Sequence, residues 1–208
     1  MLQRFAHRRP RPIAENKIFA AAIATVAVGA TQGVLDSFNV FGSKAVTELL
    51  AFLACVWLFP NEPGRRWNFW LLPVLVGAGL ICGALWIAFA ELPPGHASNP
   101  IPLNEVPFKF YVLGIVTSCV VAPLFEEKVV RHLFLDGASH YFGKVAGAII
   151  VSALFAAVHV DAVVSSFIYS VILCIGAIVF GLNTFQRSII HGVINLSIMH
   201  WALLHPLL

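Results

Sequence analysis

Long runs of apolar residues fill this chain, and short polar connections separate them. Seven such segments can be delimited: Ile18–Leu35, Ala45–Phe59, Phe69–Ala90, Phe108–Leu135, Val145–Val160, Ala162–Leu182 and Ser188–Leu204. A helix needs about 20 apolar residues to cross a bilayer, whereas a barrel strand alternates apolar and polar residues over about 10. The runs here are continuous, so the pattern predicts an all-α, polytopic transmembrane helical bundle with about seven spans.

The composition also indicates that lipid surrounds most of the chain. Hydrophobic residues make up 59% of the sequence and charged residues only 11%, and the mean hydropathy is +0.87. Soluble domains carry about 25% charged residues. We therefore expect an integral membrane protein with the lipid bilayer as its main partner, located in a cell membrane such as the inner membrane of a bacterium.

Basic residues are concentrated at the N-terminus and in alternate connections. The connections after the second, fourth and sixth segments contain Arg65 and Arg66, Lys144, and Arg187 in turn. The Pro-rich loop at residues 93–107 contains almost none. Because basic loops stay on the cytoplasmic side, the sequence predicts a cytoplasmic N-terminus and an external Pro-rich loop.

Three parts of the chain follow from this topology. Residues 1–17 form a basic cytoplasmic arm, residues 18–107 hold the N-terminal transmembrane helices and the Pro-rich loop, and residues 108–208 form the predicted catalytic core. A basic arm can also bind nucleic acid, but beside an apolar run it marks a membrane flank, so no nucleic acid is expected. A cleaved signal peptide is an alternative for the first segment, although a first span is simpler because the rest of the chain is also apolar.

The fourth segment contains two adjacent carboxylates, Glu126 and Glu127. Two like charges inside a span cannot both stay ionised without compensation. Arg131 lies one helical turn after Glu127 and can pair with it. Glu126 points elsewhere on the helix, which is one way to give two neighbouring carboxyl groups different roles. Taken alone, the motif also fits a solvated helix end.

Two further polar pairs occur at one-turn spacing in later segments. Phe155 and His159 share a face near the end of the fifth segment, and His191 and Asn195 share a face of the seventh. Gly192 allows close backbone approach there. Alone, such pairs also fit a helix cap or an interhelical hydrogen bond.

Helical rise tests whether these groups can meet. At 1.5 Å per residue, Glu126 and His159 each lie about 20–24 Å from the turn expected between their segments, so they reach one depth. His191 starts too close to the cytoplasmic end. It can join them only through tilt, a helix break near His159–Asp161, or a deeper turn around Asn183.

The three motifs together resemble a known family. They are Glu126-Glu127-x-x-x-Arg131, Phe155-x-x-x-His159 and His191-x-x-x-Asn195. Their order and separation resemble the CPBP family of CAAX proteases and bacteriocin-processing proteins, which are glutamic intramembrane endopeptidases. The resemblance extends over roughly residues 120–204. Two positions depart from the family pattern, which has an apolar residue in place of Lys128 and a glycine in place of His132.

The resemblance implies a role for each matching residue. Glu126 is the general base that activates water, His159 orients that water, and His191 and Asn195 polarise the scissile carbonyl and stabilise the oxyanion. The supporting residues are Glu127, Arg131 and Phe155. The implied activity is hydrolysis of a peptide bond in a membrane-associated protein or peptide, with no metal and no cofactor.

Other functions remain open at this stage. A non-catalytic immunity or accessory protein of the same family would keep the fold without the reaction. A small proton-coupled transporter could use Glu126 and the histidines as a relay, although the chain has no internal repeat. A metal site built from two His and two Glu is a further alternative. The four cysteines lie apart in apolar stretches, so we expect packing rather than disulfide or zinc sites.

Overall fold

The computed structural model describes residues 11–62, 64–89 and 105–204, and within these ranges the chain is helical and contains no strand. The elements are α1 Arg11–Ser37, α2 Ser43–Leu58, α3 Leu71–Phe89, α4 Phe108–Ile115, η2 Val116–Val121, α5 Ala122–Glu126, η3 Glu127–Phe134, α6 Leu135–Phe142, α7 Lys144–Ala157, η4 Val160–Ala162, α8 Val163–Ile178 and α9 Thr184–Leu204. Most of the predicted basic arm and Pro-rich loop lies outside the described residues.

The all-helical prediction is confirmed for these residues, and seven helical rods correspond to the seven apolar segments. From α4 to α6 the chain runs as one helical stretch, in which η2 and η3 are π-helical turns. Three helices are long and apolar enough to cross a membrane: Asn16–Ser37 within α1, Leu71–Phe89 and Phe108–Phe142. The helices α7 and α8 are apolar but shorter. The chain is therefore an integral membrane protein, and a count of seven spans stays a prediction.

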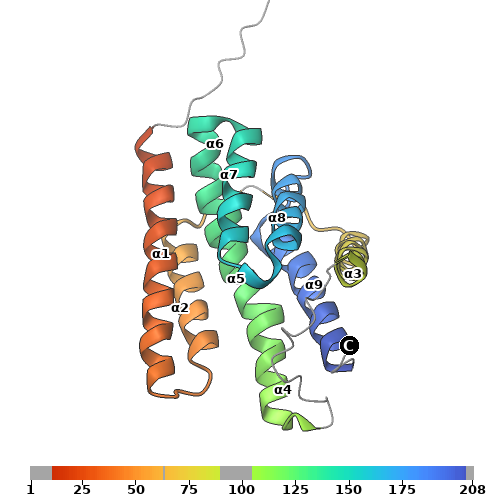
Figure 1. Cartoon of the computed structure of the whole chain (residues 1–208). Helices are drawn as coiled ribbons and strands as arrows, with labels where there is room; N and C mark the ends of the chain where they lie inside the picture. The colour runs from red at the N-terminus through yellow and green to blue at the C-terminus, as the bar shows by residue number, and fades with distance from the viewer. Residues whose placement is uncertain (1–10, 63, 90–104, 205–208) are drawn as a thin grey trace, which may run out of the picture.

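The helices do not stand as one parallel bundle. In Figure 1, α1 and α2 form an antiparallel pair beside the α4–α6 stretch, whereas α3 lies on the far side and is seen nearly end-on. The helix α3 packs on α9. A Cβ atom at Gly79 of α3 would lie 2.7 Å from the Cβ atom of Val193, so this helix pair can approach so closely only because the position is glycine.

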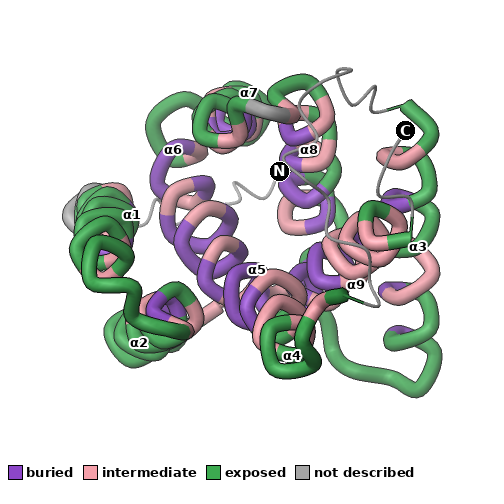
Figure 2. Tube along the Cα trace, turned by 60° about the horizontal axis from the view of Figure 1, so that its bottom comes forward, coloured by how far each residue is buried: buried purple, intermediate pink, exposed green. Residues whose placement is uncertain are grey.

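Three buried apolar clusters hold the rods together. One joins α1 and α2 to α5 and η3, one joins α3, α8 and α9, and one joins α6, α7 and α8. Figure 2 shows that buried positions line the inner faces of the α5–α6 stretch, whereas the outer faces of α1, α2 and α3 are exposed. Those outer faces carry large apolar side chains such as Phe19, Trp57 and Phe89. In an integral membrane protein, these side chains meet lipid.

Candidate active site

Glu127 is the most deeply buried charged group near the three motifs. Its side chain has 0% exposure, and Oε1 lies 3.1 Å from Arg131 Nη1. The same oxygen accepts a hydrogen bond from His191 Nδ1 at 3.0 Å, and Oε2 accepts one from Arg187 Nε at 3.1 Å. A buried carboxylate needs such compensation, because the desolvation of an unpaired charge costs several kcal/mol. Glu127 therefore ties η3 to α9.

Glu126 lies in a different environment, although it is the preceding residue. Its side chain is 24% exposed, and Oε2 lies 3.7 Å from His191 Nε2. That separation is too long for a direct hydrogen bond, but one water molecule can bridge groups at such a spacing. The backbone passes from α5 to the π-helical η3 between these two residues, and π-helical turns are frequent at functional sites.

The imidazole of His191 lies between the two glutamates. A carboxylate can only accept, so His191 Nδ1 carries the proton in its bond to Glu127. His191 Nε2 is therefore the nitrogen that faces Glu126. In the neutral ring this nitrogen is an acceptor, and in the charged ring it is a second donor.

His159 is oriented by its own chain turn. The helix α7 ends at Ala157, and His159 Nδ1 donates to the carbonyl oxygen of Phe155 at 2.7 Å. Because a carbonyl only accepts, the neutral ring leaves Nε2 as an acceptor. The helix break predicted near His159–Asp161 is present, since a short 3-10 turn at Val160–Ala162 separates α7 from α8.

The ring of Phe155 organises the groups around it. The guanidinium carbon of Arg131 lies 4.3 Å from its ring centroid, and the His159 ring stacks at 4.3 Å between centroids. The His191 ring meets Phe155 edge-on at 6.4 Å. Arg131 is thus held by the Glu127 carboxylate and by a cation–π contact, each of which stabilises a buried guanidinium.

The start of α9 also helps to place His191 at the depth of the other candidate residues. The predicted seventh segment began at Ser188, but α9 begins at Thr184. Asn183 Oδ1 accepts from the backbone N–H of Gln186 at 3.0 Å, and Gln186 Oε1 accepts from the backbone N–H of Asn183 at 3.0 Å. This reciprocal pair is a capping box. It sets His191 about two turns inside the helix, which removes the depth conflict seen in the sequence.

Three of the four candidate catalytic residues line one cavity of about 180 Å³, namely His159, His191 and Asn195. Phe155 and Tyr169 also line it. Glu126 does not line the cavity, but its Oε2 lies 3.7 Å from Nε2 of His191, which does. The structure therefore places His159, His191 and Asn195 around one cavity, with Glu126 beside His191 and outside the lining.

Asn195 is held by a π-helical turn. Its Nδ2 donates to the backbone carbonyl of Ser118 in η2 at 2.7 Å, which leaves its second N–H and its Oδ1. Nearby, a Cβ atom at Gly192 would overlap the carbonyl oxygen of Cys119. Glycine is therefore required at this position if α9 is to lie against η2 at the observed distance.

Two site-forming residues were missed in the sequence analysis. Arg187 was assigned to a cytoplasmic connection, and Glu62 lies between the second and third apolar segments. Arg187 is nevertheless buried, and its Nη2 donates to Glu62 Oε1 at 2.9 Å. Thr184 donates to Glu62 Oε2 at 2.6 Å. Burial acts to raise the pKa of Glu62, but Arg187 and the Thr184 hydrogen bond outweigh it and hold that pKa below its ordinary value.

The two positions that depart from the family pattern face the same connection. Lys128 Nζ donates to the backbone carbonyl of Phe59 at 2.7 Å, and His132 Nδ1 lies 3.7 Å from Glu62 Oε2. Lys17, which the sequence analysis counted with the arm, lies within α1 and donates to Asp136 at 2.6 Å. Lys128 and His132 are polar residues in an apolar segment. They were therefore the signal in the sequence that another part of the chain had to supply polar partners.

Among the described residues, no group of three or more His, Cys, Asp or Glu side chains is placed to hold a metal ion. The convergent groups instead offer a carboxylate, two imidazoles and an amide around a small cavity. Such a set can accept a proton from water and donate hydrogen bonds to a developing oxyanion.

Comparison with known proteins finds a protease family that the second half of the chain resembles. Residues 108–203 match the family described as Rce1-like, type II CAAX prenyl endopeptidase. This match confirms the resemblance to the CAAX proteases that the three motifs indicated. It is a family of proteases, and the matched residues include every candidate catalytic position. No curated protein and no solved structure gives a significant match.

Proposed function

We propose, from the match of residues 108–203 to the Rce1-like endopeptidases, that this membrane protein is a glutamic intramembrane endopeptidase. It hydrolyses a peptide bond of a membrane-associated protein or peptide with water that a glutamate activates. The observation that carries the proposal is the shared cavity of His159, His191 and Asn195, with Glu126 3.7 Å from His191.

Glu126 is the general base in this proposal. It is the carboxylate that retains solvent access and has no direct hydrogen bond to a cation, whereas Glu127 is saturated by Arg131, Arg187 and His191. Glu126 removes a proton from water as the oxygen attacks the carbonyl carbon. It then returns that proton to the departing amine, so the protons balance over the cycle.

The two histidines contact different reactants in the same step. His159 accepts a hydrogen bond from the water through Nε2, because its Nδ1 is already committed to Phe155. His191 and Asn195 donate to the oxyanion, a contribution typically worth about 2.7–4 kcal/mol for each donor. In this role the His191 ring carries a proton on both nitrogens, and the Glu127 carboxylate at Nδ1 stabilises that charge.

The proposal is tested with Glu126→Gln, because this change removes the base and keeps the shape of the side chain. Membrane fractions from cells that carry the wild-type protein or the variant are compared by mapping protein termini. We expect at least one new terminus that only the wild type produces, and a loss of about 10²–10⁴-fold in the rate of its formation in the variant.

Glu105→Gln is the matched control, since Glu105 is an exposed carboxylate outside the site. It should cleave like the wild type. If Glu126→Gln cleaves at the wild-type rate, the assigned base is wrong. If no terminus depends on the wild-type protein, the non-catalytic alternative gains support.

A further inference from the structure

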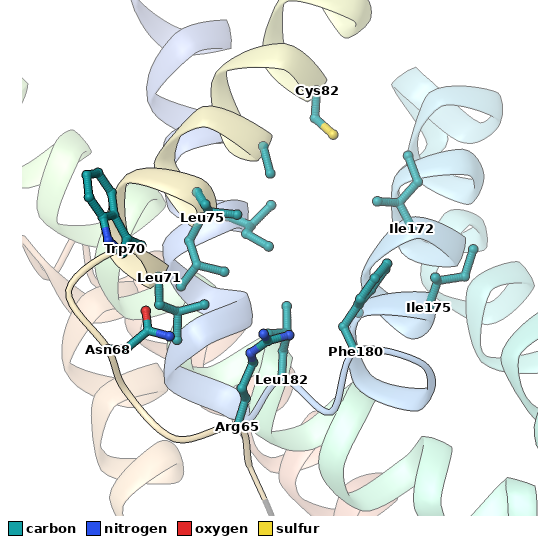
Figure 3. Close-up of a pocket in the computed structure, with 14 residues that line it drawn as sticks. Arg65, Asn68, Trp70, Leu71, Leu75, Cys82, Ile172, Ile175, Phe180 and Leu182 are labelled. Atoms are coloured by element: carbon teal, nitrogen blue, oxygen red, sulfur yellow. The ribbon is translucent and has the colours of Figure 1, made fainter.

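A second and larger cavity lies beside the candidate active site, with a volume of about 420 Å³. Figure 3 shows it between α3 and α8, with Cys82 at one end and Arg65 at the other. Both helices pack on α9. The volume is within the usual range of ligand pockets, about 300–1,000 Å³.

The cavity is separated from the candidate active site by a specific contact. Tyr169 lines the smaller cavity and donates a hydrogen bond to the backbone carbonyl of Cys82, which lines the larger one, at 2.6 Å. Leu173 and Ile194 also line only the smaller cavity, whereas Ile190 lines only the larger one. The larger cavity is therefore a compartment of its own.

The polar groups of this cavity are concentrated at one end. Arg65 and Asn68 come from the connection between α2 and α3, and the rest of the lining is apolar apart from the Cys82 thiol and the Trp70 indole. In Figure 3 the guanidinium of Arg65 turns toward the space between the two helices. Glu62, the acidic residue of the same connection, pairs with Arg187 instead of Arg65.

The backbone of Arg65 is fixed, so its side chain is presented from a defined position. Its N–H donates to the carbonyl of Gly181 at 2.8 Å. Its carbonyl accepts from Nε2 of Gln186 at 2.6 Å, and Gln186 is fully buried. A cation on a fixed backbone at the mouth of an apolar cavity is suited to an amphiphile with an anionic head.

The apolar lining favours a hydrocarbon chain over a peptide as the ligand. An extended peptide in this cavity would leave its N–H and C=O groups without partners, at a cost of several kcal/mol per group in an apolar medium. A hydrocarbon chain has no such groups. Trp67, Phe69 and Trp70 are exposed on the same connection, and aromatic residues gather at the level of lipid head groups.

We propose that this cavity binds one acyl chain of an anionic phospholipid, whose phosphate-bearing head group contacts Arg65. The lipid site goes beyond the proposed peptidase function and stands whether or not the chain cleaves peptides. It differs from the general lipid shell because the acyl chain enters between α3 and α8 instead of lying along an outer face.

The test is photo-crosslinking of the full-length protein in bilayers of neutral lipid. The probe is phosphatidylglycerol with a photoreactive group on one acyl chain, at a few per cent of the lipid. Peptide mapping should find labels on residues that line the cavity, such as Val74, Leu75, Ile172 and Ile175. Arg65 is the basic residue that lines the cavity, and loss of its contact with the phosphate should cost about 1 kcal/mol of anionic lipid binding. Arg65→Gln should therefore reduce this labelling about fivefold.

Arg66→Gln is the matched control, because Arg66 is the next residue, has the same charge and does not line the cavity. It should leave the labelling within twofold of the wild type. Ile175→Trp should block the cavity with the charge intact and lower the labelling as well. Phosphatidylcholine with the same reactive chain should label these residues about fivefold less.

Three results would overturn the proposal. They are equal labelling by the two lipids, equal loss in the Arg65 and Arg66 variants, and labels spread evenly over the outer faces of α1 and α3. The last pattern would mean a non-specific lipid shell. None of these results depends on peptidase activity, so the failure of this proposal and the failure of the proposed function are distinguishable.

Discussion

At the scale of single residues, Glu126 and Glu127 show how one backbone step separates two carboxylates. The pairing of Glu127 with Arg131 was predicted from their one-turn spacing, and the two groups lie 3.1 Å apart. The second partner, Arg187, was not predicted, because it lies 60 residues away in the chain. Local spacing reveals contacts within one helix, but a contact between helices depends on packing that one sequence does not display.

Glu127→Gln should destabilise the protein strongly, because it leaves the buried guanidiniums of Arg131 and Arg187 without their shared counter-ion. Breaking a buried ion pair typically costs about 3–5 kcal/mol. Thermal unfolding in detergent should therefore show a much lower Tm for this variant. Glu126→Gln should change the free energy of unfolding by less than about 0.5 kcal/mol, and equal losses in the two variants would contradict the assigned division of roles.

At the scale of elements, the apolar pattern located every helical rod, but not its ends. The fourth segment was predicted to end at Leu135, but the helix continues to Phe142, where its last turns pack on α1 and α7 and Asp136 accepts from Lys17. The seventh began four residues earlier than predicted. Its capping box, Asn183 with Gln186, is a local signal that the sequence carried and that a search for apolar runs overlooks.

Gly192→Ala should disturb the contact between α9 and η2. The added methyl group would overlap the carbonyl oxygen of Cys119, and such overpacking costs about 1–3 kcal/mol. The measurement is the midpoint of thermal unfolding. Gly29→Ala in α1 is the control, because a Cβ atom there meets nothing within 4 Å, and in a helix this change should be neutral or stabilising by up to about 1 kcal/mol.

The connection between α2 and α3 should give the protein a pH-dependent stability. The pKa of Glu62 is lower in the folded protein than its ordinary value, so the folded state favours the ionised form. Its contribution is complete above the ordinary carboxyl pKa and is lost as the pH falls from there through the lowered value.

Tm should therefore fall less steeply on acidification, between about pH 5 and pH 3, in Glu62→Gln than in the wild type. The variant should also start from a lower Tm at neutral pH. Glu105→Gln, which alters an exposed carboxylate, should follow the wild-type curve. Parallel curves for the wild type and Glu62→Gln would show that Glu62 does not titrate differently on folding.

At the scale of the whole molecule, the two transmembrane parts predicted from the sequence are joined by buried polar contacts. Residues 108–203 match the protease family, yet Arg187, Lys128 and His132 within that range face Glu62 or the carbonyl of Phe59 in the first half. The candidate site is therefore supported by a connection that lies outside the family match.

Cutting the chain within the Pro-rich loop tests this dependence. A fragment of residues 105–208 expressed alone should be degraded or aggregate, because Arg187 and Lys128 lose polar partners in a low-dielectric setting. Co-expression with residues 1–104 should restore a folded complex that co-purifies in mild detergent. Glu62→Ala in the first fragment should weaken the complex, and a fully stable 105–208 fragment would refute the dependence.

The buried ion pairs join residues that are made at different times during synthesis. Glu127 and Arg131 emerge from the ribosome together and can insert as a neutral pair within one helix. Glu62 is made 125 residues before its partner Arg187, so this carboxylate has no such partner until α9 has been made. Arg187 then finds both Glu62 and Glu127 in place. Arg187 is thus neutralised by two carboxylates that are both made before it, which lowers the cost of burying its charge.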